Sequence, residues 1–223
     1  MADDNTHDRP KRKDLGAFEG LLYGERSLDD IAEGLTTSDA APWGMFAKAR
    51  ELKDSDPQSA RAILRSITEM EALDSRPLLW AWKALADLGE EVPVPVATQL
   101  HGLVLHLATE KGKDIIALYR DGTARYLSEW GDLILWDDKQ PHVTSYIESI
   151  FTLADDFLMY PQLKRKDEKR DIVFYFLRPA ETAVFRVSEI DATEHEQLNS
   201  IYKRCRELGV FLQSILTQQK TVH

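Results

Sequence analysis

IIALYRDGTARYLSEWGDLILWDD, residues 115–138, decides the fold of the C-terminal half of this 223-residue chain. Three short apolar runs are separated by two turn-forming clusters, the first of which contains Asp121-Gly122. An Asp-Gly pair is a strong signal for a two-residue hairpin loop, because the favoured turn needs positive φ at both central positions. The pattern therefore predicts two antiparallel strands joined at Asp121-Gly122, in the register that places Tyr119 opposite Ala124.

The aromatic and basic side chains of this stretch raise the question of a recognition surface. In the expected register Tyr119 and Tyr126 share one covered face, where core packing explains them better than ligand stacking. Arg120 and Arg125 share the opposite face. Burying a guanidinium group in an apolar core costs free energy, so neither arginine is expected there. Trp130 lies in the second turn and has the least structural reason to be there. We therefore take Arg120, Arg125 and Trp130 as candidate binding residues.

The segments around this stretch complete an α+β pattern. VATQLHGLVLHLA, residues 96–108, predicts a preceding strand, and residues 171–190 predict a hairpin that turns near Pro179-Ala180. Helical spacing of apolar residues predicts a helix over 143–160 and a longer one over 193–218. The expected order is βββ-α-ββ-α, an antiparallel five-stranded sheet flanked by helices.

Two strands of this expected sheet, residues 133–136 and 172–177, are apolar on both sides. Strands of this kind need cover on both faces. The element order is similar in outline to the profilin-like, roadblock and longin domains, which mostly bind other proteins. No motif of these families is present, so the resemblance transfers no functional residue.

The N-terminal part of the chain has a different sequence pattern, without predicted strands. Residues 1–14 are polar and charged and predict a disordered leader, whereas residues 15–90 predict a small helical bundle with clear helix boundaries. Two prolines in residues 91–96 predict a stiff, extended linker, after which residues 97–220 form the α/β sandwich. One segment of the bundle resembles a tetratricopeptide junction, but no second copy follows it at the required period.

Composition limits the classes of partner. The net charge of −10 opposes binding to nucleic acid, which needs surplus Lys and Arg against phosphate. A single cysteine excludes an intrachain disulfide and a cysteine-rich zinc site. The polar N-terminus lacks a secretory signal, and no apolar run is long enough to span a bilayer. We expect a cytoplasmic protein with no cofactor, no metal and no membrane partner.

The residue types that carry chemistry form no catalytic constellation in the sequence. His101 and His106 lie five apart in an expected strand and point to opposite faces, so they cannot share a metal ion. Cys205 falls on the apolar stripe of the last helix, which favours a buried, unreactive thiol. Asp137-Asp138 and Asp155-Asp156 are explained by a turn and by a helix surface. The one dense basic cluster is a candidate docking loop and consists of Lys164, Arg165, Lys166, Lys169 and Arg170.

These observations predict a non-enzymatic regulatory or adaptor protein that binds another protein. Surplus Trp and Tyr residues, which often anchor interfaces, favour this interpretation. The partner could be a second copy, bound through the C-terminal helix. The alternative is a small-molecule sensor or an atypical enzyme with its site at the seam between the two modules.

Overall fold

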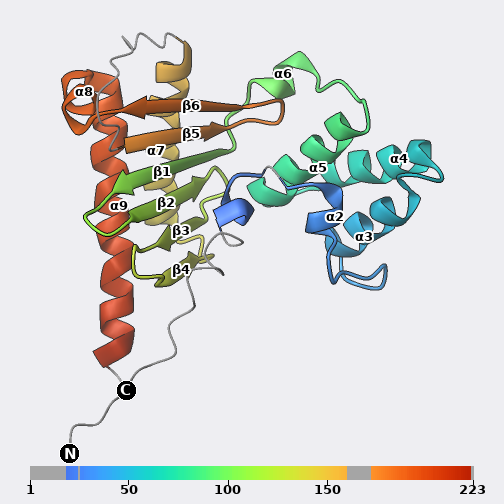
Figure 1. Cartoon of the computed structure of the whole chain (residues 1–223), viewed down its shortest axis with the longest axis horizontal. Coiled ribbons are helices and arrows are strands. Elements are labelled where there is room, and N and C mark those ends of the chain that lie inside the picture. Colours follow the sequence, from blue (N-terminus) through green and yellow to red (C-terminus); the bar gives the residue numbers. More distant parts are fainter. Residues whose placement is uncertain (1–18, 25, 160–171, 222–223) are drawn as a thin grey trace, which may run out of the picture.

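The computed structural model describes residues 19–24, 26–159 and 172–221, and it consists of a group of short helices beside a helix-covered sheet (Figure 1). The expected leader, residues 1–14, lies outside the described residues. The short helices have their own apolar core, which includes Phe46, Leu64 and Trp80. These helices are α2 (Leu28–Ile31), α3 (Trp43–Leu52), α4 (Pro57–Thr68) and α5 (Ser75–Asp87).

Local sequence signals set the helix boundaries in this bundle. Ser27 and Asp30 form a reciprocal capping box at the start of α2. Asp56 accepts a hydrogen bond from the Ser59 amide, and Pro57 occupies the first helical position of α4, where its missing N–H costs nothing. The expected extended linker is wrong in part, because its last residues belong to the short helix α6 (Val94–Ala97). Prolines suit the beginning of a helix as well as an extended chain, and here the helix is formed.

The second part of the chain is a mixed helix–sheet unit, so the predicted α+β class is confirmed. Its sheet is antiparallel throughout, with the strand order β4-β3-β2-β1-β5-β6. The prediction of five strands is wrong, because residues 115–138 contribute three strands in addition to the one before them. The six strands are β1 (Gly102–Ala108), β2 (Lys113–Tyr119), β3 (Ala124–Leu127), β4 (Leu133–Trp136), β5 (Ile172–Leu177) and β6 (Thr182–Val187).

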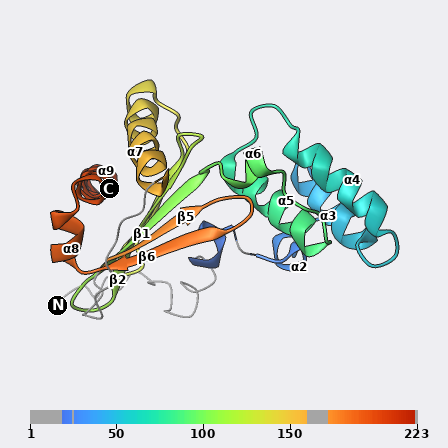
Figure 2. The same cartoon turned by 90° about the horizontal axis from the view of Figure 1, so that it is seen from above.

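Helices cover one face of this sheet. Figure 2 shows α7 (Pro141–Met159) and α9 (Glu196–Thr221) on the same side of the strands, with α8 (Glu189–Glu194) joining β6 to α9. The main core lies between these helices and the sheet and includes Phe151, Phe157 and Cys205. The single long helix expected over residues 193–218 is thus two helices, separated at His195.

A short N-terminal segment packs on the opposite face. Residues 19–22 are helical and lie across the sheet from α7 and α9 (Figure 2). The hydroxyl of Tyr119 donates a buried hydrogen bond of 3.0 Å to the carbonyl oxygen of Leu22. Leu79 of α5 joins the same apolar cluster, so the bundle reaches the sheet through one helix. Within the described residues, no helix has the length and apolar character needed to cross a membrane.

The hairpin between β2 and β3 has a different register from the one expected. The Tyr119 amide donates to the Thr123 carbonyl at 3.0 Å, and the Gly122 amide donates to the Tyr119 carbonyl at 3.0 Å. The loop therefore has three residues, with Gly122 at a φ of +87°. Ala124 pairs with Leu118 instead of Tyr119.

A shift of one residue moves every side chain of a strand to the other face. Tyr119 and Tyr126 are both buried, as expected, but they lie on opposite faces of the sheet. Arg120 and Arg125 do not share a face either. Arg120 lies over the Phe151 ring of α7, whereas Arg125 is paired with Ala117, a member of the opposite cluster.

Candidate functional site: an apolar groove between α7 and α9

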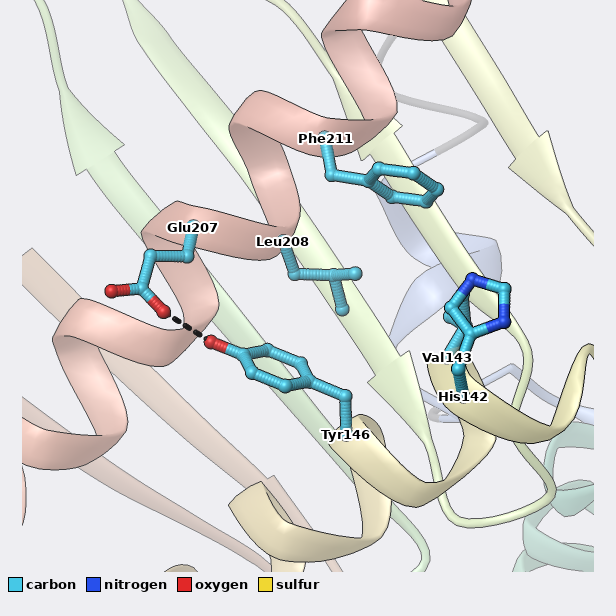
Figure 3. A pocket seen from close by; sticks show the side chains of 6 residues that line it. All are labelled: His142, Val143, Tyr146, Glu207, Leu208 and Phe211. Atoms are coloured by element: carbon cyan, nitrogen blue, oxygen red, sulfur yellow. Dashed lines mark hydrogen bonds between the residues drawn. The ribbon is translucent and has the colours of Figure 1, made fainter.

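The clearest apolar hollow on the described surface lies between α7 and α9 (Figure 3). Val143 and Leu208, both buried, form its floor, and the partly exposed rings of Tyr146 and Phe211 form its sides. His142 and Glu207 complete the lining. The cavity has a volume of about 260 Å³, which is enough for a large apolar side chain.

Among the described side chains, the polar contacts between the two helices lie at one end of the groove. The Tyr146 hydroxyl donates a hydrogen bond to the Glu207 carboxylate across the gap (Figure 3). One turn further along α7, the Arg204 guanidinium donates to the Ser149 hydroxyl at 2.5 Å. Burial, followed by the Glu207 carboxylate, raises the pKa of Tyr146 and keeps its hydroxyl protonated as a donor. Beyond these contacts the start of α7 and the later turns of α9 leave the space between His142 and Phe211.

Strand β4 continues the apolar surface from the groove to the edge of the sheet. The Phe211 ring meets the Trp136 ring edge to face, with centroids 5.6 Å apart. On the other face of the same strand, Leu135 is 57% exposed. The expectation that residues 133–136 are covered on both faces is therefore wrong for Leu135.

The three candidates from the opening stretch do not come together. Arg120 forms an ion pair with Asp155 at 2.5 Å on the surface of α7. Arg125 is only 3% exposed, contrary to the expectation that it avoids the core. Trp130 is 49% exposed in the turn between β3 and β4, with the Lys111 ammonium 4.4 Å from its ring centroid. These three side chains therefore lie on the surface beside α7, in the interior of the sheet and in an exposed turn, respectively.

Arg125 can be buried because its guanidinium is hydrogen bonded. It donates to the carbonyl oxygens of Ala124 and Trp136 at 2.7 and 3.0 Å, and it forms an ion pair with Asp137. These contacts tie β3 to the end of β4. The guanidinium of Arg125 therefore binds groups of its own chain and is not exposed to a ligand.

The other predicted docking element lies outside the described residues. It is the basic cluster of Lys164, Arg165, Lys166, Lys169 and Arg170.

One titratable cluster and the single cysteine have structural roles elsewhere. The Tyr23 hydroxyl and the His106 ring nitrogen Nε2 are hydrogen bonded, and both rings lie against Tyr175. Burial lowers the pKa of His106 to about 4, so the imidazole is neutral at pH 7 and joins the segment 19–24 to the sheet. Burial also raises the pKa of the Cys205 thiol, as expected for a core position. No group of three or more His, Cys, Asp or Glu side chains in the described parts of the chain is arranged to hold a metal ion.

Sequence reasoning missed the importance of Phe211. The signal is the run Val210-Phe211-Leu212, because three consecutive helical residues are spread around the helix and cannot all face one core. Leu212 is fully buried, whereas Val210 and Phe211 are 64% and 37% exposed. An apolar residue beside the buried stripe thus indicates a surface that the chain does not cover itself.

No family model matches this sequence, and neither the curated proteins nor the solved structures contain a match.

Proposed function

We propose that this chain is a non-enzymatic regulatory or adaptor protein, and that the groove between α7 and α9 receives an apolar side chain of another protein. The observation that carries the proposal is the exposed Phe211 ring above a buried floor of Val143 and Leu208. A partly exposed aromatic ring beside a desolvated pocket is typical of interface hot spots.

The size and chemistry of the groove favour a protein side chain over a metabolite. Its volume of about 260 Å³ is below the range of roughly 300–1,000 Å³ that is usual for small-molecule sites. Two of its polar groups, the Tyr146 hydroxyl and the Glu207 carboxylate, are hydrogen bonded to each other, and the exposed His142 imidazole is the third. The groove therefore offers apolar contact with few polar groups left to orient a ligand.

Charge around the groove indicates the kind of partner. Glu207 on α9 is exposed, and so are Asp137 and Asp138 after β4. Two basic groups nearby have partners within the chain, since Lys139 pairs with Asp74 at 3.0 Å and Arg204 donates to Ser149, and of the acidic groups Asp137 is paired with Arg125. The whole chain carries a net charge of −10. We therefore expect a partner segment in which Lys or Arg residues flank the apolar side chain.

The test compares two variants on the same helical turn, Phe211→Ala and Val210→Ala. Phe211 lines the groove, whereas the more exposed Val210 does not. Proteins retained from the native host by the wild type and by the Val210 variant, but lost with the Phe211 variant, are then purified and titrated. We expect the Phe211 change to weaken direct binding by about tenfold or more and the Val210 change by less than about twofold.

Equal binding by both variants would overturn the proposal. So would a native mass spectrum of the chain, purified from its host, that shows a stoichiometric metabolite or metal. That second result would favour a sensor or enzyme.

One observation supports this alternative of a site at the seam. A cavity of about 300 Å³ lies between the bundle and the β5–β6 turn, and Tyr23, Lys83 and Arg178 are among its lining residues. Two cationic side chains beside a hydroxyl could hold a small anion. However, Lys83 is paired with Asp87, and Glu181 of the same lining lies 4.0 Å from the Arg178 guanidinium. Net positive charge at the seam is therefore small.

A further inference from the structure

We infer that the partner also adds a short extended strand to the free edge of β4, beneath the last turns of α9, with Lys or Arg residues at both ends of that strand. The inference rests on the proposed function, because it assumes a protein partner at this end of the molecule. It adds the conformation of the bound segment and the chemistry that recognises it.

The backbone of β4 presents unused hydrogen-bonding groups. The Ser128 amide donates to the Asp132 carbonyl at 2.9 Å, which makes Ser128 and Asp132 a hydrogen-bonded pair at the start of the β3–β4 ladder. Such pairs alternate in an antiparallel ladder, so Ile134 and Trp136 bond to β3 while Leu133 and Leu135 direct their N–H and C=O groups outward. Among the residues that the structure describes, none forms a hydrogen bond with those four outward groups.

Free sheet edges normally carry protection against pairing with other chains. A very short strand, Lys, Pro, inward-pointing charge and bulges are the usual devices, and of these the four-residue strand β4, Leu-Ile-Leu-Trp, has only its short length. The other edge strand, β6, carries the exposed Arg186 in its interior and packs against α8. Of the two edges, β4 is therefore the one suited to accept a strand.

Helix α9 is longer than the sheet is wide. Its 26 residues span about 39 Å at 1.5 Å per residue, whereas six strands about 4.8 Å apart span about 24 Å. Figure 1 shows α9 continuing beyond β4, so that its last turns have no strand beneath them. A seventh strand beside β4 would lie in this position and would be covered by the helix on one side.

Such a strand would have apolar neighbours on both faces. On the helix side its residues would contact Trp136 and the groove residue Phe211, and on the other side they would contact Leu135. Alternate side chains of the added strand would thus both bury apolar area. Leu135, which the sequence predicts to be covered, would become covered in the complex.

Charge selects a basic partner over a second copy of this chain. Asp132 precedes β4, and Asp137 and Asp138 follow it. Arg125 balances the charge of Asp137, but antiparallel pairing of two β4 strands would still bring Asp138 of one copy beside Asp132 of the other at both ends, and like charges across a ladder are destabilising. Lys or Arg at the ends of a partner strand would convert these repulsions into attractions.

The first experiment selects short peptides from a phage-displayed random library on the full chain and examines one synthetic binder by amide hydrogen exchange. We expect alternating apolar residues flanked by Lys or Arg. In the free chain the Leu133 and Leu135 amides should exchange rapidly, and the bound peptide should slow both by about tenfold or more. The Ile134 and Trp136 amides, already bonded to β3, are the internal control and should be protected in both states.

The second experiment uses two substitutions at one position. Leu135→Pro removes the outward N–H and leaves the ladder to β3 intact, whereas Leu135→Thr keeps the N–H. Both substitutions remove the leucine side chain, so they differ in the N–H group. We expect peptide affinity to fall about tenfold with proline and less than about threefold with threonine.

The outcomes separate this inference from the proposed function. If Phe211→Ala weakens peptide binding while both Leu135 variants and the exchange of Leu133 and Leu135 are unaffected, the groove is a docking site and strand addition is wrong. If the peptides are indifferent to Phe211→Ala as well, both proposals fail. Protection of Leu133 and Leu135 in a free chain that sediments as a dimer would make the occupant a second copy and would overturn the basic partner.

Discussion

Arg125 shows how a residue that looks like a ligand-binding group can serve the fold. A charged side chain in a sheet costs several kcal/mol to bury unless its donors are satisfied. The two terminal nitrogens of its guanidinium donate to two carbonyl oxygens and to the Asp137 carboxylate, at the place where β4 ends, whereas its buried Nε–H has no partner among the described residues. Arg120, five residues earlier, makes its ion pair with Asp155 on the surface.

We predict that Arg125→Ala lowers the free energy of unfolding by about 3 kcal/mol, because it removes the buried hydrogen bonds to Ala124 and Trp136, the ion pair with Asp137 and the packing of a large buried side chain. Arg120→Ala should cost less than about 1 kcal/mol, since exposed ion pairs contribute little. Urea unfolding of both variants provides the measurement. Equal losses would contradict the assignment of Arg125 to the core.

At the scale of elements, the β2–β3 hairpin decides which side chains face which layer. Its three-residue loop needs a left-handed residue at Gly122, where φ is +87°. A Cβ at this position would lie 2.7 Å from the Thr144 Oγ1 atom of α7. Backbone conformation and close helix contact therefore both require glycine here.

Gly122→Ala should consequently destabilise the chain by about 2 kcal/mol through strained φ and the clash with Thr144. Gly112, in the neighbouring β1–β2 turn, is the matched control, because its φ is not positive and a Cβ there meets nothing closer than 3.8 Å. Gly112→Ala should change stability by less than about 0.5 kcal/mol. Thermal unfolding of the two variants tests the difference, and similar values would argue against the hairpin geometry.

At the scale of the whole molecule, the helical bundle is attached to the sheet through this same hairpin. The Ser75 amide, at the start of α5, donates to the Asp121 carboxylate at 2.6 Å. Asp74, the residue before α5, makes no capping hydrogen bond with its side chain and pairs instead with Lys139. Asp121 thus caps a helix of the other module, which couples the two parts of the chain.

Asp121→Ala should cost about 1–2 kcal/mol, the usual effect of removing a helix cap, and should accelerate hydrogen exchange at the Ser75 amide. Asp138→Ala is the control, since Asp138 is exposed and accepts only from the nearby Gln140 side chain. Unchanged exchange at Ser75 would show that the modules are held together by other contacts. The apolar contact of Leu79 with the sheet would then be the first candidate.

The docking surface also belongs to the whole molecule. Leu198, Ile201, Cys205, Leu208 and Leu212 of α9 are buried against its own sheet. A dimer through the C-terminal helix, which the sequence analysis kept as one possibility, would use exposed residues of α9, and Val210 and Phe211 are its exposed large apolar residues among those described. Phe211 also lines the groove, so a second copy that covered it would compete with a foreign partner.

The sequence by itself determined the features that depend on local spacing. Period-two and helical patterns predicted the α+β class, the long helix after Pro141, the turn at Pro179-Ala180 and the buried Cys205, because these patterns report which residues must leave water. The same patterns placed Val143 and Leu208 on apolar stripes.

Tertiary structure decided the rest. The register of the β2–β3 hairpin depended on a three-residue loop, one residue longer than the two-residue loop that an Asp-Gly pair favours. This register set the faces on which Tyr119 and Arg125 lie. The groove depended on where α7 and α9 diverge, and the open edge of β4 depended on its place at the end of the strand order. Neither is a property of any single segment, since both arise from how far one element extends past another.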